Sequence, residues 1–255
     1  MKGVLFAPAG RGPFPALLAI HAVFGLDDWT REQATRLSDA GYVVLAVDLY
    51  GGKVANGLDD AGELLRRIPT GSAQRELLAG LAFLRTQPNV SRDRLGSMGW
   101  CMGGTWAFRL ASLDSFLKVA VVRYGHLSDD PRTLTELNAR ILGIFGGKDR
   151  SIPVADVHRF AQQMHDLGKP ADIIIYPEAG HAFETPEHLH TIDSAYHGYR
   201  TQDTADAWTR TIAFLDSSLK AAGPAANGKH RSLRAWSWLG VYRVLTRLRP
   251  SAFAR

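Results

Sequence analysis

Short apolar runs alternate along the chain with longer segments in which apolar residues recur every three or four positions. Uninterrupted short runs are typical of strands buried on both faces of a parallel sheet, and the longer period is typical of helices. Their alternation predicts an α/β domain with a mostly parallel, twisted sheet and helices on both faces. About seven strands are expected: Val4–Ala7, Ala16–His21, Tyr42–Asp48, Leu95–Trp100, Lys118–Tyr124, Arg140–Gly146 and Asp172–Tyr176.

The predicted helices end at residues that stop helices. Glycine follows the segments Asp28–Ala40 and Ile152–Leu167, and proline follows the segment Ser72–Gln87. Glycine adopts the left-handed backbone that closes many helices, and proline cannot continue one. We therefore expect each of these segments to be one helix that connects two strands.

The chain changes character after a further helix predicted over Thr201–Lys220. The next eight residues, Ala-Ala-Gly-Pro-Ala-Ala-Asn-Gly, have the composition of a flexible linker. The net charge is +5, but the residues from 221 onward carry seven lysines and arginines and no acid, which leaves −2 for residues 1–220. The sequence predicts one α/β domain over residues 1–220 and a basic linker and C-terminal extension over residues 221–255.

The extension interleaves arginines with aromatic residues such as Trp236, Trp238 and Tyr242. This composition suits an anionic membrane surface, nucleic acid or a partner protein. On a helical wheel, however, the arginines scatter around the axis and form no single polar face. We favour an extension that covers part of the domain or an oligomer interface, and we do not favour peripheral membrane contact. We expect a monomer or homodimer that binds no nucleic acid.

Composition excludes several classes of protein. The chain has 45% hydrophobic and 22% charged residues, which is typical of a globular domain. The only cysteine, Cys101, has no partner for an internal disulfide, which favours a reducing compartment. No run approaches the roughly 18 to 20 apolar residues of a membrane span, and the run Val4–Ala7 is too short for a secretory signal. We therefore expect a cytoplasmic protein.

A nucleophile motif surrounds the cysteine. Gly99-Trp100-Cys101-Met102-Gly103 follows a predicted strand and precedes the helical segment Thr105–Ser112. This is the G-x-nucleophile-x-G turn between a strand and a helix, with cysteine in the place of serine. The helix start favours a thiolate, and the backbone N–H after the nucleophile is placed to bind an oxyanion. A buried structural thiol is the alternative interpretation, and the motif makes the nucleophile the favoured one.

An acid and a histidine follow the nucleophile at the ends of later predicted strands. Asp149 follows Arg140–Gly146, and His181 follows Asp172–Tyr176. In enzymes built on this motif the triad residues occur in the chain order nucleophile, acid, histidine. A histidine can accept and return a proton at neutral pH, and a carboxylate fixes its tautomer. Asp48 and Glu178 are the second candidates for the acid.

Six motifs resemble those of the dienelactone hydrolases, which are cysteine-dependent members of the α/β-hydrolase fold, and the resemblance spans residues 3 to about 220. The motifs are His21-Ala22-Val23-Phe24-Gly25, Val47-Asp48-Leu49-Tyr50, Gly99-Trp100-Cys101-Met102-Gly103-Gly104, Arg123-Tyr124-Gly125, Gly146-Gly147-Lys148-Asp149 and Ala179-Gly180-His181-Ala182-Phe183.

The resemblance implies an α/β-hydrolase fold and a triad of Cys101, Asp149 and His181. It also implies an oxyanion hole formed by the backbone N–H groups of Val23 and Met102. The expected reaction is hydrolysis of a small carboxylic ester or lactone through an acyl-enzyme, without a cofactor. The chain also begins later than the relatives, which implies that a first edge strand is missing.

Three positions depart from the relatives that cleave dienelactone. They have a glutamate where this chain has Ala22, a serine where it has Ala182, and an arginine where it has Thr185. These departures argue against dienelactone as the substrate. Ala22 in the place of the glutamate also supports the alternative that the protein is a catalytically weakened, ligand-binding or regulatory member of the same fold.

Other residues are secondary candidates. Tyr124 is expected to form a wall of the substrate pocket. Three arginines, Arg66, Arg67 and Arg123, either reach a substrate carboxylate or face solvent. The pair His188-Leu189-His190 has no second ligand pair at metal-binding spacing and is interpreted as loop, so no metal is expected.

Overall fold

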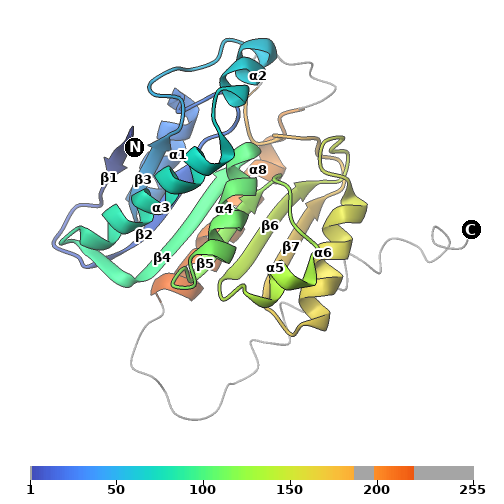
Figure 1. Cartoon of the computed structure of the whole chain (residues 1–255). Helices are drawn as coiled ribbons and strands as arrows, with labels where there is room; N and C mark the ends of the chain where they lie inside the picture. Colours follow the sequence, from blue (N-terminus) through green and yellow to red (C-terminus); the bar gives the residue numbers. More distant parts are fainter. Residues whose placement is uncertain (1, 187–197, 221–255) are drawn as a thin grey trace, which may run out of the picture.

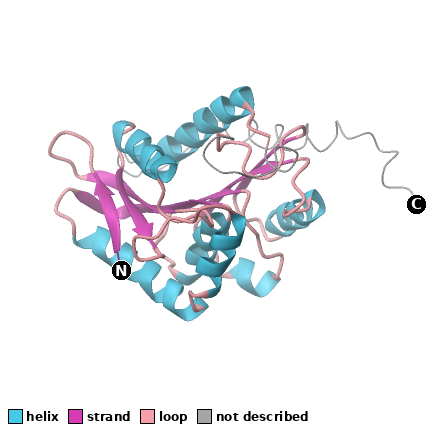
Figure 2. Ribbon diagram, turned by 90° about the horizontal axis from the view of Figure 1, so that it is seen from above, coloured by secondary structure: helices cyan, strands magenta, loops and turns pink. Residues whose placement is uncertain are grey.

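The computed structural model describes residues 2–186 and 198–220. In this part of the chain a seven-stranded sheet is covered by helices on both faces (Figure 1; Figure 2). The layered α/β architecture and the strand count predicted from the hydrophobic pattern are confirmed. The strands are β1 (Lys2–Phe6), β2 (Phe14–Ile20), β3 (Val43–Asp48), β4 (Val90–Trp100), β5 (Val119–Arg123), β6 (Arg140–Gly146) and β7 (Ala171–Tyr176).

The sheet order places the ends of the central strands together. The strands lie in the order β1-β3-β2-β4-β5-β6-β7, and only β1 is antiparallel to its neighbour. Ile20 of β2 pairs with Gly99 of β4, and Arg123 of β5 pairs with Ile144 of β6. These strands therefore end at the same level, and the segments that follow them meet at one edge of the sheet, where α/β proteins bind ligands.

Helices α1 and α8 pack on one face of the sheet, and the buried residues of α2 to α6 pack on the other. A five-residue π-helical segment, Asp216–Lys220, continues α8. Seen from above, the two helical layers enclose the sheet (Figure 2). The helices are α1 (Asp28–Asp39), α2 (Leu58–Arg66), α3 (Thr70–Thr86), α4 (Met102–Leu113), α5 (Pro131–Thr135), α6 (Val154–Asp166) and α8 (Thr201–Leu215).

Two helices were not predicted from the hydrophobic pattern. Helix α2 has nine residues and α5 has five, so neither repeats the helical period often enough to reveal it. Helix α4 begins at Met102, three residues before the predicted start. The earlier start places the first turn of α4 directly after Cys101.

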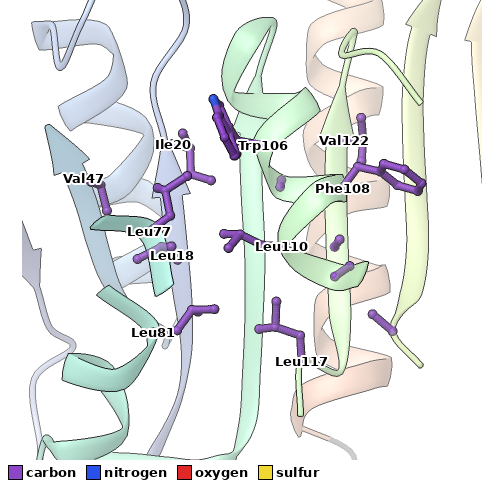
Figure 3. Packing of buried hydrophobic residues seen from close by; sticks show 14 of the residues in the cluster. Leu18, Ile20, Val47, Leu77, Leu81, Trp106, Phe108, Leu110, Leu117 and Val122 are labelled. Carbon is purple, nitrogen blue, oxygen red and sulfur yellow. The ribbon is translucent and has the colours of Figure 1, made fainter. Parts of the chain in front are cut away.

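The core is built from strand residues that point alternately to the two helical layers. Leu18 and Ile20 of β2 pack toward the layer with α3 and α4, whereas Leu17 and Ala19 pack toward the other layer. All four are fully buried. Figure 3 shows Leu18 and Ile20 among side chains of α3 and α4. Burying each Leu or Ile side chain stabilises the fold by about 1.5–3 kcal/mol, so the central strands and α4 form a rigid support.

Some predictions fall outside the described residues. They concern the linker and extension at 221–255 and the residues His188 and His190. In the part of the chain that the structure describes, no helix is both long enough and apolar enough to cross a lipid bilayer.

Candidate active site

Cys101 lies in a sharp turn between β4 and α4. Its φ of 54° falls in the left-handed region, which is strained for a residue with a side chain. A Cβ atom on Gly99 would lie 2.1 Å from the carbonyl oxygen of Gly103, and a Cβ atom on Gly103 would lie 2.1 Å from the carbonyl oxygen of Ile20. Only glycine therefore permits the close approach of β4, α4 and β2 that forces Cys101 into this conformation.

Backbone hydrogen bonds hold the turn in place. The Cys101 N–H donates to the carbonyl oxygen of Arg123 at 2.9 Å, and the Thr105 N–H donates to the carbonyl oxygen of Cys101 at 3.2 Å. Met102 is the first residue of α4, and the first N–H groups of a helix have no acceptor within the helix. The thiol is thus half-buried beside the positive end of a helix, where negative charge is stabilised.

His181 and Asp149 form a buried pair at the ends of β7 and β6. The Nδ1 of His181 lies 2.8 Å from the Oδ2 of Asp149. The other carboxylate oxygen of Asp149 accepts the backbone N–H groups of Ser151 at 2.7 Å and Ile152 at 3.0 Å. Because both carboxylate oxygens are engaged, Asp149 holds the imidazole ring in one orientation and leaves its Nε2 for Cys101.

Two opposing effects act on the His181 pKa. Burial disfavours the charged imidazolium and lowers the pKa, whereas the hydrogen bonds to Asp149 and Cys101 and the charges on these residues raise it. The second effect is the larger, and the pKa rises to about 10. At neutral pH the histidine is therefore an imidazolium, which places a positive charge beside the sulfur of Cys101.

His21 organises the loop that follows β2. Its Nε2 accepts the backbone N–H of Leu49 at 3.2 Å, so its Nδ1 carries the proton and donates to the carbonyl oxygen of Ala22 at 2.6 Å. Burial lowers the His21 pKa and keeps the ring neutral. In a planar trans peptide the N–H points opposite to the C=O. Holding the Ala22 carbonyl toward the ring therefore turns the Val23 N–H away from it.

Tyr124 follows β5 and lies beside the catalytic candidates. Its φ is 38°, and its backbone N–H donates to the carbonyl oxygen of Ile144 at 2.8 Å. The ring is almost fully buried and meets the ring of His181 edge-on, with centroids 5.2 Å apart. Burial raises the Tyr124 pKa, so the phenol is neutral. Its ring contributes to the wall of the cavity that contains Cys101.

The second candidates for the acid have other roles. Asp48 accepts the backbone N–H of Tyr50 at 2.9 Å and so closes the turn after β3. Glu178 is exposed and pairs with Lys148 on the surface. Of the three acids considered, only Asp149 bonds to His181.

None of the three candidate arginines reaches the cavity that contains Cys101. Arg66 and Arg67 are exposed and do not line it. Arg123 is buried and points to the opposite side of the sheet, where it pairs with Glu184 and donates to the Thr211 hydroxyl at 2.6 Å. The two possibilities considered for Arg123, a substrate ligand or a solvated side chain, are both wrong, because an arginine buried at a strand end requires an internal partner.

One cavity of about 500 Å³ contains the candidate residues. Its lining includes Cys101, Met102, Val23, Tyr124 and His181, which come from four different segments of the chain. The three positions that depart from the relatives also line it, namely Ala22, Ala182 and Thr185. Asp149 lies behind His181, outside the lining.

Several lining residues were not predicted. Leu58 and Leu65 come from α2, and Arg109 and His126 lie on the exposed rim. Because α2 was not predicted, the sequence carried no signal for its two leucines. Among the described residues, no group of three or more histidine, cysteine or acidic side chains is placed to hold a metal ion.

A mostly parallel sheet with a nucleophile turn after a central strand defines the α/β-hydrolase fold. Within that fold, the sequence pattern of the dienelactone hydrolase family matches residues 1–219. The chain therefore belongs to the dienelactone hydrolase family.

Individual relatives agree with this assignment. A protein of Methylorubrum extorquens strain AM1 named "Putative carboxymethylenebutenolidase" is 31% identical over 217 residues, which cover 80% of this chain and 72% of that protein. A Bradyrhizobium protein named "Probable 2-oxo-3-(5-oxofuran-2-ylidene)propanoate lactonase" is 30% identical over 224 residues, which cover 83% of this chain and 87% of that protein. The crystal structure of a putative dienelactone hydrolase from Klebsiella pneumoniae matches with a TM-score of 0.69 and 28% identity. The match covers 82% of this chain and 90% of that chain.

Proposed function

We propose that this member of the dienelactone hydrolase family cleaves small carboxylic esters or lactones through a covalent acyl-enzyme. The observation that carries the proposal is the position of His181, which interacts with both the Asp149 carboxylate and the Cys101 sulfur at the floor of one cavity. This arrangement matches the roles of nucleophile, base and orienting acid in a catalytic triad. The names of the relatives, a carboxymethylenebutenolidase and a lactonase, support an ester or lactone substrate.

In the first half of the reaction, the Cys101 thiolate attacks the substrate carbonyl and forms a tetrahedral intermediate. The negative oxygen accepts hydrogen bonds from the backbone N–H groups of Val23 and Met102, which stabilise the charge as it develops. The C–O bond then breaks, and the His181 imidazolium gives its proton to the leaving alkoxide. The products of this half are an alcohol and a thioester on Cys101; in a lactone the alcohol remains attached to the acyl group.

In the second half, water attacks the thioester carbonyl. His181, now neutral, takes a proton from the water, and the C–S bond breaks to release the carboxylic acid and the thiolate. Asp149 keeps the imidazole in the tautomer that both halves require. Tyr124 packs against His181 and limits the space available to the substrate. No step requires a cofactor.

The test is hydrolysis of 4-nitrophenyl acetate by the full chain and by Cys101→Ala. We expect turnover in the full chain and a loss of at least about a thousandfold in the variant, because both half-reactions pass through the sulfur. Mass spectrometry of the full chain mixed with substrate should detect an acetyl group on Cys101. Circular dichroism and thermal unfolding of the variant control for its fold.

Unchanged turnover in Cys101→Ala would reject the cysteine as nucleophile. If the folded wild-type protein instead hydrolyses no ester, lactone or thioester of a broad panel, the alternative of a ligand-binding or regulatory member is favoured. That alternative is based on Ala22, whose side chain is only a methyl group on the wall of the cavity that contains Cys101.

The proposed chemistry also bears on location. Cys101 is the only cysteine of the chain and must remain a reduced thiol to act as nucleophile. Reducing conditions of this kind prevail in the cytoplasm. We therefore propose a cytoplasmic enzyme.

A further inference from the structure

One side of the cavity is apolar and extends away from Cys101 toward α2. Six side chains form it, and we call this set the α2 wall: Phe24, Leu49, Leu58, Leu65, Ile68 and Trp106. Met102, the residue after the proposed nucleophile, lines the same cavity. The α2 wall is therefore continuous with the place where the reacting carbonyl group would lie.

Helix α2 presents two partly exposed leucines to the cavity. Leu58 and Leu65 lie two turns apart and so share one stripe of the helix. They are 53% and 40% exposed, while Ala61 and Leu64 of the same helix are buried in the core. In Figure 1, α2 stands beyond the upper end of the sheet, apart from the helices that lie across its faces. The buried residues anchor α2, and the leucine stripe is left to contact whatever enters the cavity.

The cavity offers little to a substrate with a second carboxylate. Among its described lining residues, Arg109 is the only lysine or arginine, and it is exposed, with its guanidinium 5.2 Å from the centre of the Trp106 ring. The lining also includes the acidic side chain of Asp27. An ion pair at an exposed arginine contributes little to binding, and removing a carboxylate from water without a buried partner is unfavourable.

We propose that the α2 wall binds an uncharged, apolar chain of the ester substrate, so that the enzyme prefers alkyl or aryl esters over esters that carry a second carboxylate. The inference rests on the proposed function, since it assigns a substrate class to the same site. Burial of the chain covers the leucine stripe and removes apolar surface from water on both partners. The cavity volume of about 500 Å³ is within the range of pockets that enclose small organic ligands.

The first test is a series of 4-nitrophenyl esters from acetate to hexanoate. A buried methylene group contributes about 0.8 kcal/mol, which corresponds to about a fourfold change. We expect kcat/KM to rise at least tenfold from acetate to hexanoate. A parallel series of alkyl acetates, from methyl to hexyl, distinguishes a chain on the acyl side from one on the alcohol side. A rise in either series supports the proposal, and two flat series overturn it.

The second test compares two substrates of matched shape. The 4-nitrophenyl monoesters of 4-methylpentanoic acid and of succinic acid end in an isopropyl group and a carboxylate at the same position. We expect kcat/KM to be at least tenfold higher for the 4-methylpentanoate. A preference for the succinate that disappears in Arg109→Ala would overturn the proposal in favour of an acidic substrate held at the rim.

The third test changes the wall itself. Leu58→Gln and Leu65→Gln keep a helix-favouring side chain of similar length but remove its apolar end. The double variant should lower the ratio of kcat/KM for hexanoate to that for acetate at least tenfold. The control is Leu113→Gln, which alters a leucine that is 46% exposed at the end of α4 far from Cys101 and does not line the cavity. An equal ratio in the double variant and the control would overturn the proposal.

A binding measurement separates this inference from the proposed function. Calorimetric titration of Cys101→Ala with 4-nitrophenyl hexanoate and 4-nitrophenyl acetate measures the affinity of the cavity for each ester. This measurement does not depend on whether the wild-type protein hydrolyses them. We expect at least tenfold tighter binding of the hexanoate, lost when Leu58→Gln and Leu65→Gln are added. Equal affinities would reject the apolar site even in an active enzyme, whereas tight hexanoate binding by a wild-type protein without turnover would reject only the proposed reaction.

Discussion

The buried imidazole of His21 joins two loops at the edge of the sheet. It accepts a hydrogen bond from the backbone of Leu49, after β3, and donates one to the carbonyl of Ala22, after β2. The same carbonyl accepts the Gly25 N–H at 3.3 Å. The Ala22–Val23 peptide is thus held from one side, which orients the Val23 N–H. We infer that His21 acts on the reaction through this peptide, without touching the substrate.

Replacing His21 should lower kcat and leave KM almost unchanged. Loss of one oxyanion-hole donor lowers kcat about 10²–10³-fold. His21→Leu keeps the Val23 N–H but no longer fixes its orientation, so we expect kcat with 4-nitrophenyl acetate to decrease about 10–100-fold. His21→Gln can both donate and accept and should restore much of the rate. Equal kcat values for His21→Leu and wild type, at equal fold stability, would contradict the positioning role.

The raised pKa of His181 predicts a pH-dependent stability. A folded-state pKa of about 10, against an ordinary value of 6.5, means that the folded protein holds this proton more tightly than the unfolded chain. The stabilisation is fully present below about pH 6.5 and is lost as the pH rises through the folded-state pKa. Urea unfolding of wild type and His181→Gln at pH 6.5 and pH 8.5 measures it.

We expect the free energy of unfolding of wild type, relative to His181→Gln, to fall by about 2 kcal/mol between pH 6.5 and pH 8.5. The upper limit for one proton is about 1.4 kcal/mol per pH unit. If the difference in the free energy of unfolding between wild type and His181→Gln stays constant over this range, then His181 titrates near its ordinary pKa and the imidazolium is not held beside Cys101.

At the scale of elements, a buried ion pair joins β5 to the segment that carries His181. Arg123, the last residue of β5, is 2% exposed and Glu184, three residues after His181, is 4% exposed. The guanidinium also donates to Thr211 of α8, on the same side of the sheet. The pair therefore fixes the His181 segment between a central strand and a helix, on the face opposite the cavity.

Breaking this pair should destabilise the fold strongly. Removing one partner of a buried ion pair leaves an uncompensated charge and costs about 3–5 kcal/mol. We expect losses of this size for Arg123→Met and for Glu184→Leu alone, and recovery of most of the loss in the double variant, as measured by urea unfolding. The exposed pair Arg67 and Glu63 is the control, because Glu63→Ala should cost no more than about 1 kcal/mol. Additive losses in the double variant would refute the pairing.

At the scale of the whole molecule, charge divides the chain into two parts. Residues 221–255 carry seven basic residues and no acid, whereas residues 1–220 have a net charge of −2. All residues of the candidate triad lie between positions 101 and 181. We therefore expect the proposed chemistry not to need the extension, whose charge fits contact with the acidic domain or with a second copy of it.

Deleting residues 225–255 should leave hydrolysis of 4-nitrophenyl acetate within about threefold of the full chain. We expect a lower thermal stability or a changed oligomeric state, measured by calorimetry and light scattering. Binding to acidic vesicles or to DNA that weakens with salt, and that disappears on truncation, would instead identify the extension as an anionic-surface device, because such binding depends on released counterions.

The sequence by itself determined the seven strands, the longer connecting helices and the order of the candidate triad. These features depend on local properties: the apolar runs of β2 and β4, the glycines on either side of Cys101, and the positions of Asp149 and His181 after predicted strands. Because parallel strands end at one edge of the sheet, the chain order alone predicts which loops meet there.

Only the tertiary structure decided which side chains line the cavity and which are buried elsewhere. Arg123 follows the same strand as Tyr124, yet the alternation of side chains sends one to Glu184 and the other to the cavity. The leucines of α2 reach the cavity only because Ala61 and Leu64 anchor a helix too short to be recognised from its period. Such contacts join residues far apart in the chain, so no local pattern encodes them, and they depend on how the elements pack together.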